Sequence, residues 1–187
     1  RPASALVRDY WTYNGYLEPI ESVEVRSKIR GFLTEVLFKE GAEVPEDAPL
    51  YTIDSPDLIQ AESTLISTAG TLALTNRVLE RAKQLSAIQG IAQKDLDQAA
   101  SDQQAADGAH KAARNALRIY GKSDAEMDRI VSERKIDSVL TVRSPMSGRV
   151  TARNAAQGLL VQPGTAPAPY VVSDLSTVWM IANVAEP

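Results

Sequence analysis

The stretch that decides the fold reads SPDLIQAESTLISTAGTLALTNRVLERA and runs from Ser55 to Ala82. It opens with a helix-start signal, because Ser55 is a residue type that caps helices and Pro56 suits the first helical position. Leucine then recurs every seven residues, and alanine or threonine follows three positions after each leucine. The heptad positions are Leu58, Leu65, Leu72 and Leu79, with Ala61, Thr68, Thr75 and Ala82. This pattern predicts a long helix with one face packed against another helix.

A second helical run follows a break in phase at Ile88–Ile91, where Gly90 supplies a turn residue. The run again places its seam at spacings of three and four residues. These positions are Leu96, Ala99, Gln103, Ala106, His110, Ala113, Leu117 and Tyr120. Two such helices joined by a tight turn predict an antiparallel helical hairpin over residues 56–120. At about 1.5 Å per residue, a helix of roughly thirty residues reaches about 45 Å.

The segments on either side of the hairpin repeat one another. Val25–Gly31 (VRSKIRG) aligns with Val142–Gly148 (VRSPMSG) at an offset of 117 residues (142 minus 25), and four of the seven positions are identical. At the same offset Gly41 meets Gly158 and Val44 meets Val161. Two or three extra residues in 163–169 then align Tyr51–Asp54 with Val171–Asp174. Such a repeat indicates two copies of one structural unit.

Each half contains about four short strands, with Gly31 expected to break one of them, and one half alone cannot bury its apolar face. We therefore expect the two halves to pack face to face as a small β-sandwich, with inward-facing residues of both sheets as its core. The hairpin would be an insertion between the halves. The predicted fold class is thus α+β, a split β-sandwich with an inserted antiparallel coiled-coil hairpin.

Further strands are predicted at both ends, outside the repeat. Residues 4–16 mix β-branched, aromatic and polar residues up to Gly15, and residues 175–184 form a similar run. Ser123-Asp124-Ala125-Glu126 is a capping box that opens a short helix to about Arg134. The predicted organisation assigns 21–54 and 136–174 to the sandwich and 55–135 to the hairpin and short helix. Residues 1–20 and 175–187 are assigned to edge strands of a largely missing further domain.

Composition excludes several functional classes. The 187 residues carry a net charge of -4 without a Lys/Arg-rich run, which argues against a nucleic-acid partner. Cysteine is absent, His110 is the single histidine, and no phosphate-binding, dinucleotide-binding or nucleophile motif occurs. We therefore expect no enzymatic activity, no cofactor and no metal site. No apolar run approaches the roughly 18 residues of a membrane span. Because the chain begins at Arg1 without an initiator Met or signal peptide, we expect a processed or excised chain.

The hairpin turn is the candidate binding site. Leu85, Ile88 and Ile91 place apolar residues at the outer end of a long projection, and exposed apolar residues there indicate a contact surface. The remaining hairpin surface is charged and is expected to face solvent. These charged residues are Glu62, Arg77, Glu80, Arg81, Lys83, Lys94, Asp95 and Asp97. His110 is expected on the helix seam, roughly opposite Gly70.

Together these features resemble the periplasmic adaptor subunits (membrane fusion proteins, HlyD type) of tripartite efflux pumps. Residues 25–54 and 142–173 are similar to the two halves of that family's lipoyl-like domain (barrel-sandwich hybrid), and residues 56–120 to its helical hairpin. Residues 174–180 (DLSTVWM) resemble the entry into its β-barrel domain. The short helix and the ending that contains Trp179 resemble the RND class, including its heavy-metal-efflux branch.

The resemblance implies a partner site at the hairpin tip. Adaptors that dock on TolC-type outer-membrane channels carry Arg, then Leu four positions on, then Ser seven further. Arg81 and Leu85 match this signature, whereas Ala92 replaces the serine, whose hydroxyl is expected to bind channel backbone. The implied partners are that channel, an inner-membrane RND-type transporter and further copies of the chain in a ring (trimer or hexamer). The implied location is the periplasm, in association with the inner membrane.

Three other interpretations remain open at this stage. One is a carrier domain for biotin or lipoate, although the segment between the halves lacks the usual lysine signature. Another is an adaptor of a type I secretion or ABC pump. The third is a purely structural coiled-coil spacer, whose heptads should continue without a docking motif at the tip. The residues leave the exported substrate, a metal ion or an organic compound, undecided, since its selection is expected to reside in the transporter.

Overall fold

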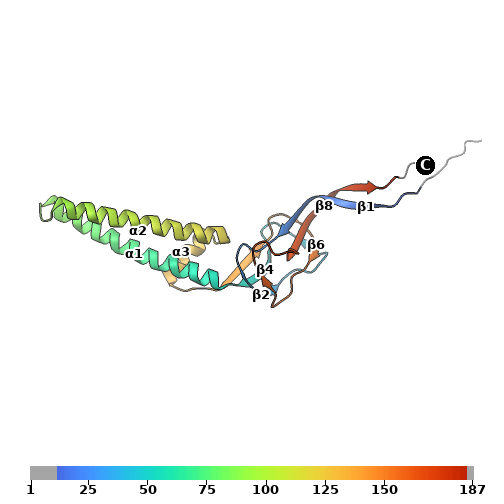
Figure 1. The fold of residues 1–187 in the computed structure, drawn as a ribbon, viewed down its shortest axis with the longest axis horizontal. Helices are drawn as coiled ribbons and strands as arrows, with labels where there is room; N and C mark the ends of the chain where they lie inside the picture. Colours follow the sequence, from blue (N-terminus) through green and yellow to red (C-terminus); the bar gives the residue numbers. More distant parts are fainter. Residues whose placement is uncertain (1–11, 185–187) are drawn as a thin grey trace, which may run out of the picture.

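The computed structural model describes residues 12–184. The strands are β1 (Gly15–Val25), β2 (Gly31–Val36), β3 (Glu43–Val44), β4 (Pro49–Asp54), β5 (Val139–Arg143), β6 (Gly148–Arg153), β7 (Leu160–Val161) and β8 (Tyr170–Ala182). The helices are α1 (Pro56–Ala87), α2 (Gln93–Tyr120) and α3 (Asp124–Glu133). Figure 1 shows a β-sandwich in the middle, the α1–α2 hairpin projecting to one side and a β1–β8 ribbon projecting to the other.

The two halves of the repeat interleave in the sandwich. One sheet has the strand order β1-β8-β6-β3 and the other β5-β4-β2-β7. The repeat relates β1 to β5, β2 to β6, β3 to β7 and β4 to β8, so it converts the first order into the second. The expectation that each half packs as a unit against the other is therefore wrong, because each sheet takes two strands from each half. Neither half can form a complete sheet without the other.

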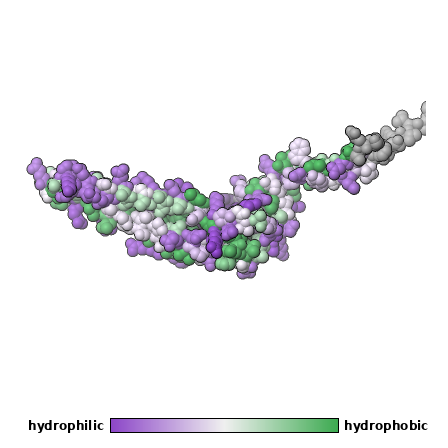
Figure 2. Space-filling view, viewed as in Figure 1, coloured by the Kyte–Doolittle hydropathy of each residue, from purple (hydrophilic) through white to green (hydrophobic). Residues whose placement is uncertain are grey.

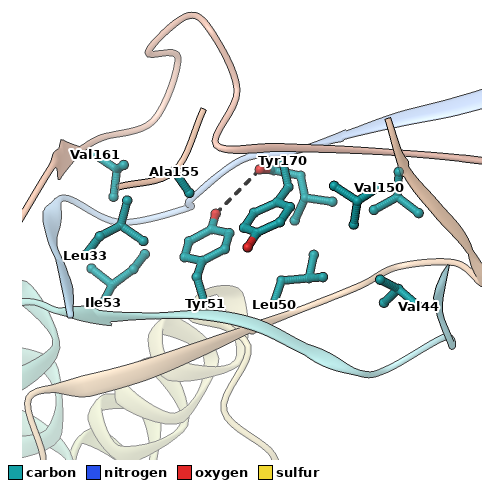
Figure 3. Packing of buried hydrophobic residues seen from close by; sticks show 11 residues of the cluster. Leu33, Val44, Leu50, Tyr51, Ile53, Val150, Ala155, Val161 and Tyr170 are labelled. Atoms are coloured by element: carbon teal, nitrogen blue, oxygen red, sulfur yellow. Dashed lines mark hydrogen bonds between the residues drawn. The ribbon is translucent and has the colours of Figure 1, made fainter. Parts of the chain in front are cut away.

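Two stacked tyrosines mark the centre of the sandwich core. The rings of Tyr51 on β4 and Tyr170 on β8 are nearly parallel, with centroids 5.8 Å apart and planes 7° apart (Figure 3). The Tyr170 hydroxyl donates a hydrogen bond of 2.6 Å to the Phe38 carbonyl. Burial raises the pKa of both phenols, most strongly that of Tyr51. Around the rings pack Val25, Leu33, Val44, Leu50, Ile53, Val150, Ala155, Val161 and Val172.

The tyrosine stack corrects the sequence alignment of the repeat. Leu33 pairs with Ile53 and Val150 pairs with Val172, which makes Tyr170 the counterpart of Tyr51. The alignment of Tyr51 with Val171 is therefore wrong by one residue. A one-residue shift sends every side chain of a strand to the opposite face. Val171, the residue aligned with Tyr51, therefore lies on the face of β8 opposite to the core residue Tyr170. The second half contains two extra residues in its last loop rather than three.

Gly31 begins β2 instead of breaking a strand. A Cβ atom on Gly31 would lie 2.4 Å from the Asp54 carbonyl oxygen on β4, and one on Gly148 would lie 2.6 Å from the Ser173 carbonyl oxygen on β8. The repeat makes Gly148 the counterpart of Gly31. Glycine is required at both positions because the backbones of adjacent strands approach too closely for a side chain.

The terminal strands differ from their predicted limits. β1 begins at Gly15, where the predicted strand was expected to end, and residues 4–11 of that prediction lie outside the described residues. β8 runs without interruption through residues 170–182, which the sequence divided into two strands. Both strands pass from the sandwich into the ribbon, and the pairing shifts between Pro19 and Glu21, at the predicted boundary near residue 20.

The hairpin helices lie where the heptads predict them. All eight heptad positions of α1 are buried or half-buried, and so are all eight seam positions of α2. The α3 helix starts with the predicted capping box, in which Ser123 and Glu126 each accept a hydrogen bond from the other's backbone N–H. Ser55 differs from expectation, since its hydroxyl does not cap α1 but donates a 2.6 Å hydrogen bond to the Arg30 carbonyl. None of the helices within residues 12–184 combines the length and apolar character needed to cross a bilayer.

Candidate functional site

The five predicted binding residues all lie at the outer end of the hairpin. Arg81 and Leu85 belong to the last two turns of α1, and Ile88 is its C-cap. Ile88 is 75% exposed and Leu85 is 38% exposed, whereas Ile91 is only partly exposed. Ala92 is the N-cap of α2 and is exposed. In Figure 1 this turn is the part of the hairpin farthest from the sandwich.

The tip backbone is fixed by a Schellman motif, in which two N–H groups beyond the helix bond back into its last turn. The Gly90 N–H donates to the Leu85 carbonyl at 2.8 Å, and the Gln89 N–H donates to the Ser86 carbonyl at 3.0 Å. The left-handed residue is Gln89 (φ 55°) rather than the expected glycine. Gly90 itself does not have a positive φ, and a Cβ atom there would make a tight contact, 3.2 Å from the Leu85 carbonyl oxygen. The turn therefore presents Ile88 outward on an ordered backbone.

Two of the five residues have roles within the hairpin itself. Ile91 precedes the N-cap of α2 and Leu96 follows it by four positions, which is the spacing of a hydrophobic staple. Both residues are half-buried. Ala92 occupies the N-cap, so a serine at this position would lie where a hydroxyl accepts a hydrogen bond from the first turn of its own helix. This geometry offers an intramolecular role for the serine hydroxyl that the family resemblance assigns to channel binding.

Replacing Ala92 with serine is therefore expected to stabilise the hairpin by about 1 kcal/mol, since an N-cap hydroxyl satisfies one free N–H of the helix. Thermal unfolding followed by circular dichroism at 222 nm measures the effect. The neighbouring Gln93→Ser variant, one position inside the helix, is the control and should not be stabilised. If Ala92→Ser leaves the transition unchanged, position 92 does not act as a helix cap.

An exposed apolar stripe extends the tip along α1, and the sequence interpretation missed it. Leu74 and Val78 are 57% and 45% exposed and precede Arg81, Leu85 and Ile88 at spacings of four and three residues. These spacings place all five residues on one side of the helix over about 21 Å. The signal was present in the sequence as a second heptad series, offset from the buried leucine series. Figure 2 shows hydrophobic residues among hydrophilic ones along this hairpin.

Charged groups at the hairpin base attach α3 to α2. Arg114 donates hydrogen bonds to Asp124 (2.9 Å) and Asp128 (2.6 Å), and Arg118 also bonds Asp124. The hydrogen bonds from Arg114 and then Arg118 hold the pKa of Asp124 below its usual value. The Asp124 carboxylate is exposed, so this network orients α3 more than it stabilises the fold.

Two other hairpin residues differ from their predicted surroundings. Glu62, expected on the solvent face, is fully buried. His110 lies on the seam as expected, but Gly70 is exposed and does not face it. The His110 ring instead borders a groove lined by Ala69 and Asn76 of α1, and its Nδ1 atom is buried without a hydrogen-bond partner. Within residues 12–184, no three His, Cys, Asp or Glu side chains gather as a metal site would require.

The chain matches one protein family over most of its length. The family of RND membrane fusion proteins, described by their barrel-sandwich hybrid domain, matches residues 21–173. This segment contains the interleaved sandwich and the inserted hairpin.

Individual relatives agree with this match. The chain is 34% identical to the multidrug resistance protein MexA of Pseudomonas aeruginosa over 164 residues, which covers 88% of this chain and 36% of MexA. It is 32% identical to the multidrug efflux pump subunit AcrA of Escherichia coli K12 over 165 residues, covering 84% and 37% of the two chains. The crystal structure of ZneB from Cupriavidus metallidurans superposes with a TM-score of 0.65 at 29% identity, covering 90% of this chain and 66% of that one.

The chain thus spans a little over a third of the length of these curated relatives. The part that matches the family includes both halves of the sandwich and the hairpin between them. The match to an RND family also favours that class over a biotin or lipoate carrier and over an ABC-pump adaptor. The chain belongs to the periplasmic adaptors, or membrane fusion proteins, of RND efflux pumps.

Proposed function

We propose that this chain is the central part of a periplasmic adaptor that connects an inner-membrane RND-type transporter to a TolC-type outer-membrane channel. The hairpin tip docks on the channel, and the lipoyl-like sandwich packs against further copies in a ring. The role is mechanical and not enzymatic. The observation that carries the proposal is the exposed apolar tip at the far end of a long hairpin, in a chain of this family.

The stripe on α1 indicates how the tip binds. Its residues follow a heptad spacing, which is the arrangement used when one helix packs lengthwise on another. A channel built of helices would bury Leu85 and Ile88 between its own side chains. Arg81 lies within the stripe and can donate hydrogen bonds to carboxylates or carbonyls at the edge of the contact.

Two exposed surfaces support the other proposed contacts. Phe32 on β2 is 54% exposed and pairs with Leu160 on the short edge strand β7, which forms an apolar patch suited to packing against a second copy. On the β1–β8 ribbon, Leu17 and Met180 are directly paired and both exposed. A two-stranded ribbon is marginally stable alone, so we assign it to the β-barrel domain that the remainder of the adaptor would complete. The proposed location is the periplasm, with the full-length adaptor held at the inner membrane.

The tip is tested by placing a charge on it. Leu85→Asp and Ile88→Asp in the full-length adaptor are each expected to weaken channel binding by about 2 kcal/mol, roughly thirtyfold, because a carboxylate would be buried in an apolar contact. Efflux measured by dye accumulation in cells that depend on this pump should fall accordingly. The thermal transition of the purified Ile88→Asp protein should change little, since Ile88 is 75% exposed and a negative charge at a helix C-terminus costs less than about 1 kcal/mol.

Ile59→Asp is the matched control, because Ile59 lies at the other end of the same helix. Its exposed fraction, 43%, is similar to the 38% of Leu85. This variant is expected to retain efflux. Equal loss of efflux in all three variants, or normal efflux in both tip variants, would contradict docking through the tip.

A further inference from the structure

A buried carboxylate lies where the hairpin joins the sandwich. Glu62 is on the second turn of α1, and its side chain is 0% exposed. One of its oxygens, Oε2, accepts a 2.7 Å hydrogen bond from the backbone N–H of Asp137, in the link between α3 and β5. The other, Oε1, lies 3.1 Å from the ammonium group of Lys122, in the link between α2 and α3. One side chain therefore contacts two segments that are distant in sequence.

The contact with Lys122 is an ion pair without a well-directed hydrogen bond, since Oε1 has no partner of acceptable geometry. Lys122 is itself only 10% exposed, so both charges are largely removed from water. A buried ion pair contributes little net stability compared with apolar residues of similar size, because desolvation offsets the attraction. Fold stability is therefore a poor explanation for charges at this position.

The apolar contacts at the hairpin base do not by themselves fix the direction in which the hairpin projects from the sandwich. An apolar cluster joins the hairpin base to the sandwich through Leu58, Leu117, Met127 and Leu140. Apolar packing is non-directional, so it permits small rotations of the hairpin. The hydrogen bond that Glu62 accepts from the Asp137 N–H is directional, so it depends on the position of α1 relative to the link between α3 and β5. Ser55 adds one more, donating its N–H to the Ser138 carbonyl at 2.9 Å.

We propose that Glu62 is a positioning residue that fixes the angle between the hairpin and the sandwich by bonding Asp137 and Lys122. A tip about 45 Å from the sandwich is displaced several ångströms by a rotation of a few degrees at the base. The contacts of Glu62 with Asp137 and Lys122 would thus hold the tip at one place in the assembly. This inference adds to the proposed docking function, yet it concerns the free protein and can fail while tip docking stands.

The test measures the hairpin angle directly. Because the chain contains no cysteine, Gln84→Cys and Glu40→Cys place two spin labels at exposed sites of α1 and of the sandwich. Double electron–electron resonance should give one narrow distance population in the parent protein. The same population should persist with Glu62→Gln combined with Lys122→Met, which keeps an acceptor for the Asp137 N–H and leaves no charge unpaired.

The decisive variant is the double replacement Glu62→Met with Lys122→Met, which removes both bonds without leaving a charge unpaired. It should fold, with the same circular dichroism, but lose the single narrow population. Persistence of the narrow population in this folded variant would overturn the proposal.

Hydrogen exchange on the unmodified chain gives a second readout that does not depend on the variant folding. The Asp137 amide should exchange as slowly as the amides of α1 around Leu65, because its N–H can exchange only when its hydrogen bond to Glu62 breaks. Exchange at the rate of an exposed loop amide would overturn the proposal equally. A purely structural role for Glu62 would change the unfolding transition of the double variant and leave its distance distribution narrow.

Discussion

Replacing Gly31 with alanine is expected to lower the free energy of unfolding by about 3 kcal/mol, at the upper end of typical overpacking costs. The new Cβ atom would lie 2.4 Å from both the Asp54 carbonyl oxygen and the Ile53 Cγ2 atom. The oxygen belongs to the backbone of the neighbouring strand, so relief requires β2 and β4 to separate. Gly148→Ala should destabilise for the same reason, because its Cβ atom would lie 2.6 Å from the Ser173 carbonyl oxygen.

Urea unfolding of the purified chain measures both effects. Gly70→Ala is the matched control, because Gly70 lies in α1 with nothing within 4 Å of the added atom. That substitution should stabilise by about 1 kcal/mol, owing to the better helix propensity of alanine. If Gly31→Ala and Gly70→Ala shifted the midpoint in the same direction, the close approach of β2 and β4 would be disproved.

Replacing Leu65 with alanine should cost about 4 kcal/mol, whereas the next heptad leucine, Leu72, should cost about half as much. Leu65 is fully buried in the cluster that joins the hairpin to the sandwich, together with Leu117 of α2 and Met127 of α3. Leu72 is only half-buried and does not belong to that cluster. Leu65 and Leu72 occupy the same heptad position, yet their replacement is expected to lower the free energy of unfolding by different amounts. The reason is that only Leu65 lies in the cluster formed by all three helices.

The same urea titration compares the two leucine variants, and Leu79→Ala extends the series toward the tip. The account predicts costs that decrease from Leu65 outward. Equal losses at Leu65 and Leu79 would mean that the hairpin base has no special core and that the helices stabilise one another uniformly.

The helical part of the fold follows from local sequence pattern. Heptad spacing at Leu58 and Leu65 predicts both the helix and its buried face, and a capping box at Ser123 predicts the start of α3. These features depend on residues close together in the chain, which is why they can be read without a structure. The tip residues Leu85 and Ile88 were found in the same way, as apolar residues at a predicted turn.

Features that depend on pairing between distant segments were not predictable. The stack of Tyr51 on Tyr170 and the close approach at Gly31 depend on strand register, which the repeat alignment fixed only to within one residue. Glu62 resembles any surface glutamate in the sequence, since its partners lie 60 and 75 residues away. The left-handed conformation of Gln89 was not predictable either, because glycine usually takes that position and Gly90 is the next residue.

Photo-crosslinking in cells tests the central claim, that the tip binds the outer-membrane channel, most directly. A photoreactive phenylalanine analogue at position 85 of the full-length adaptor should form an adduct with the channel, identified by mass spectrometry. The same analogue at position 59, at the other end of α1, should not. Adducts with the channel from position 59 but none from position 85 would contradict the account.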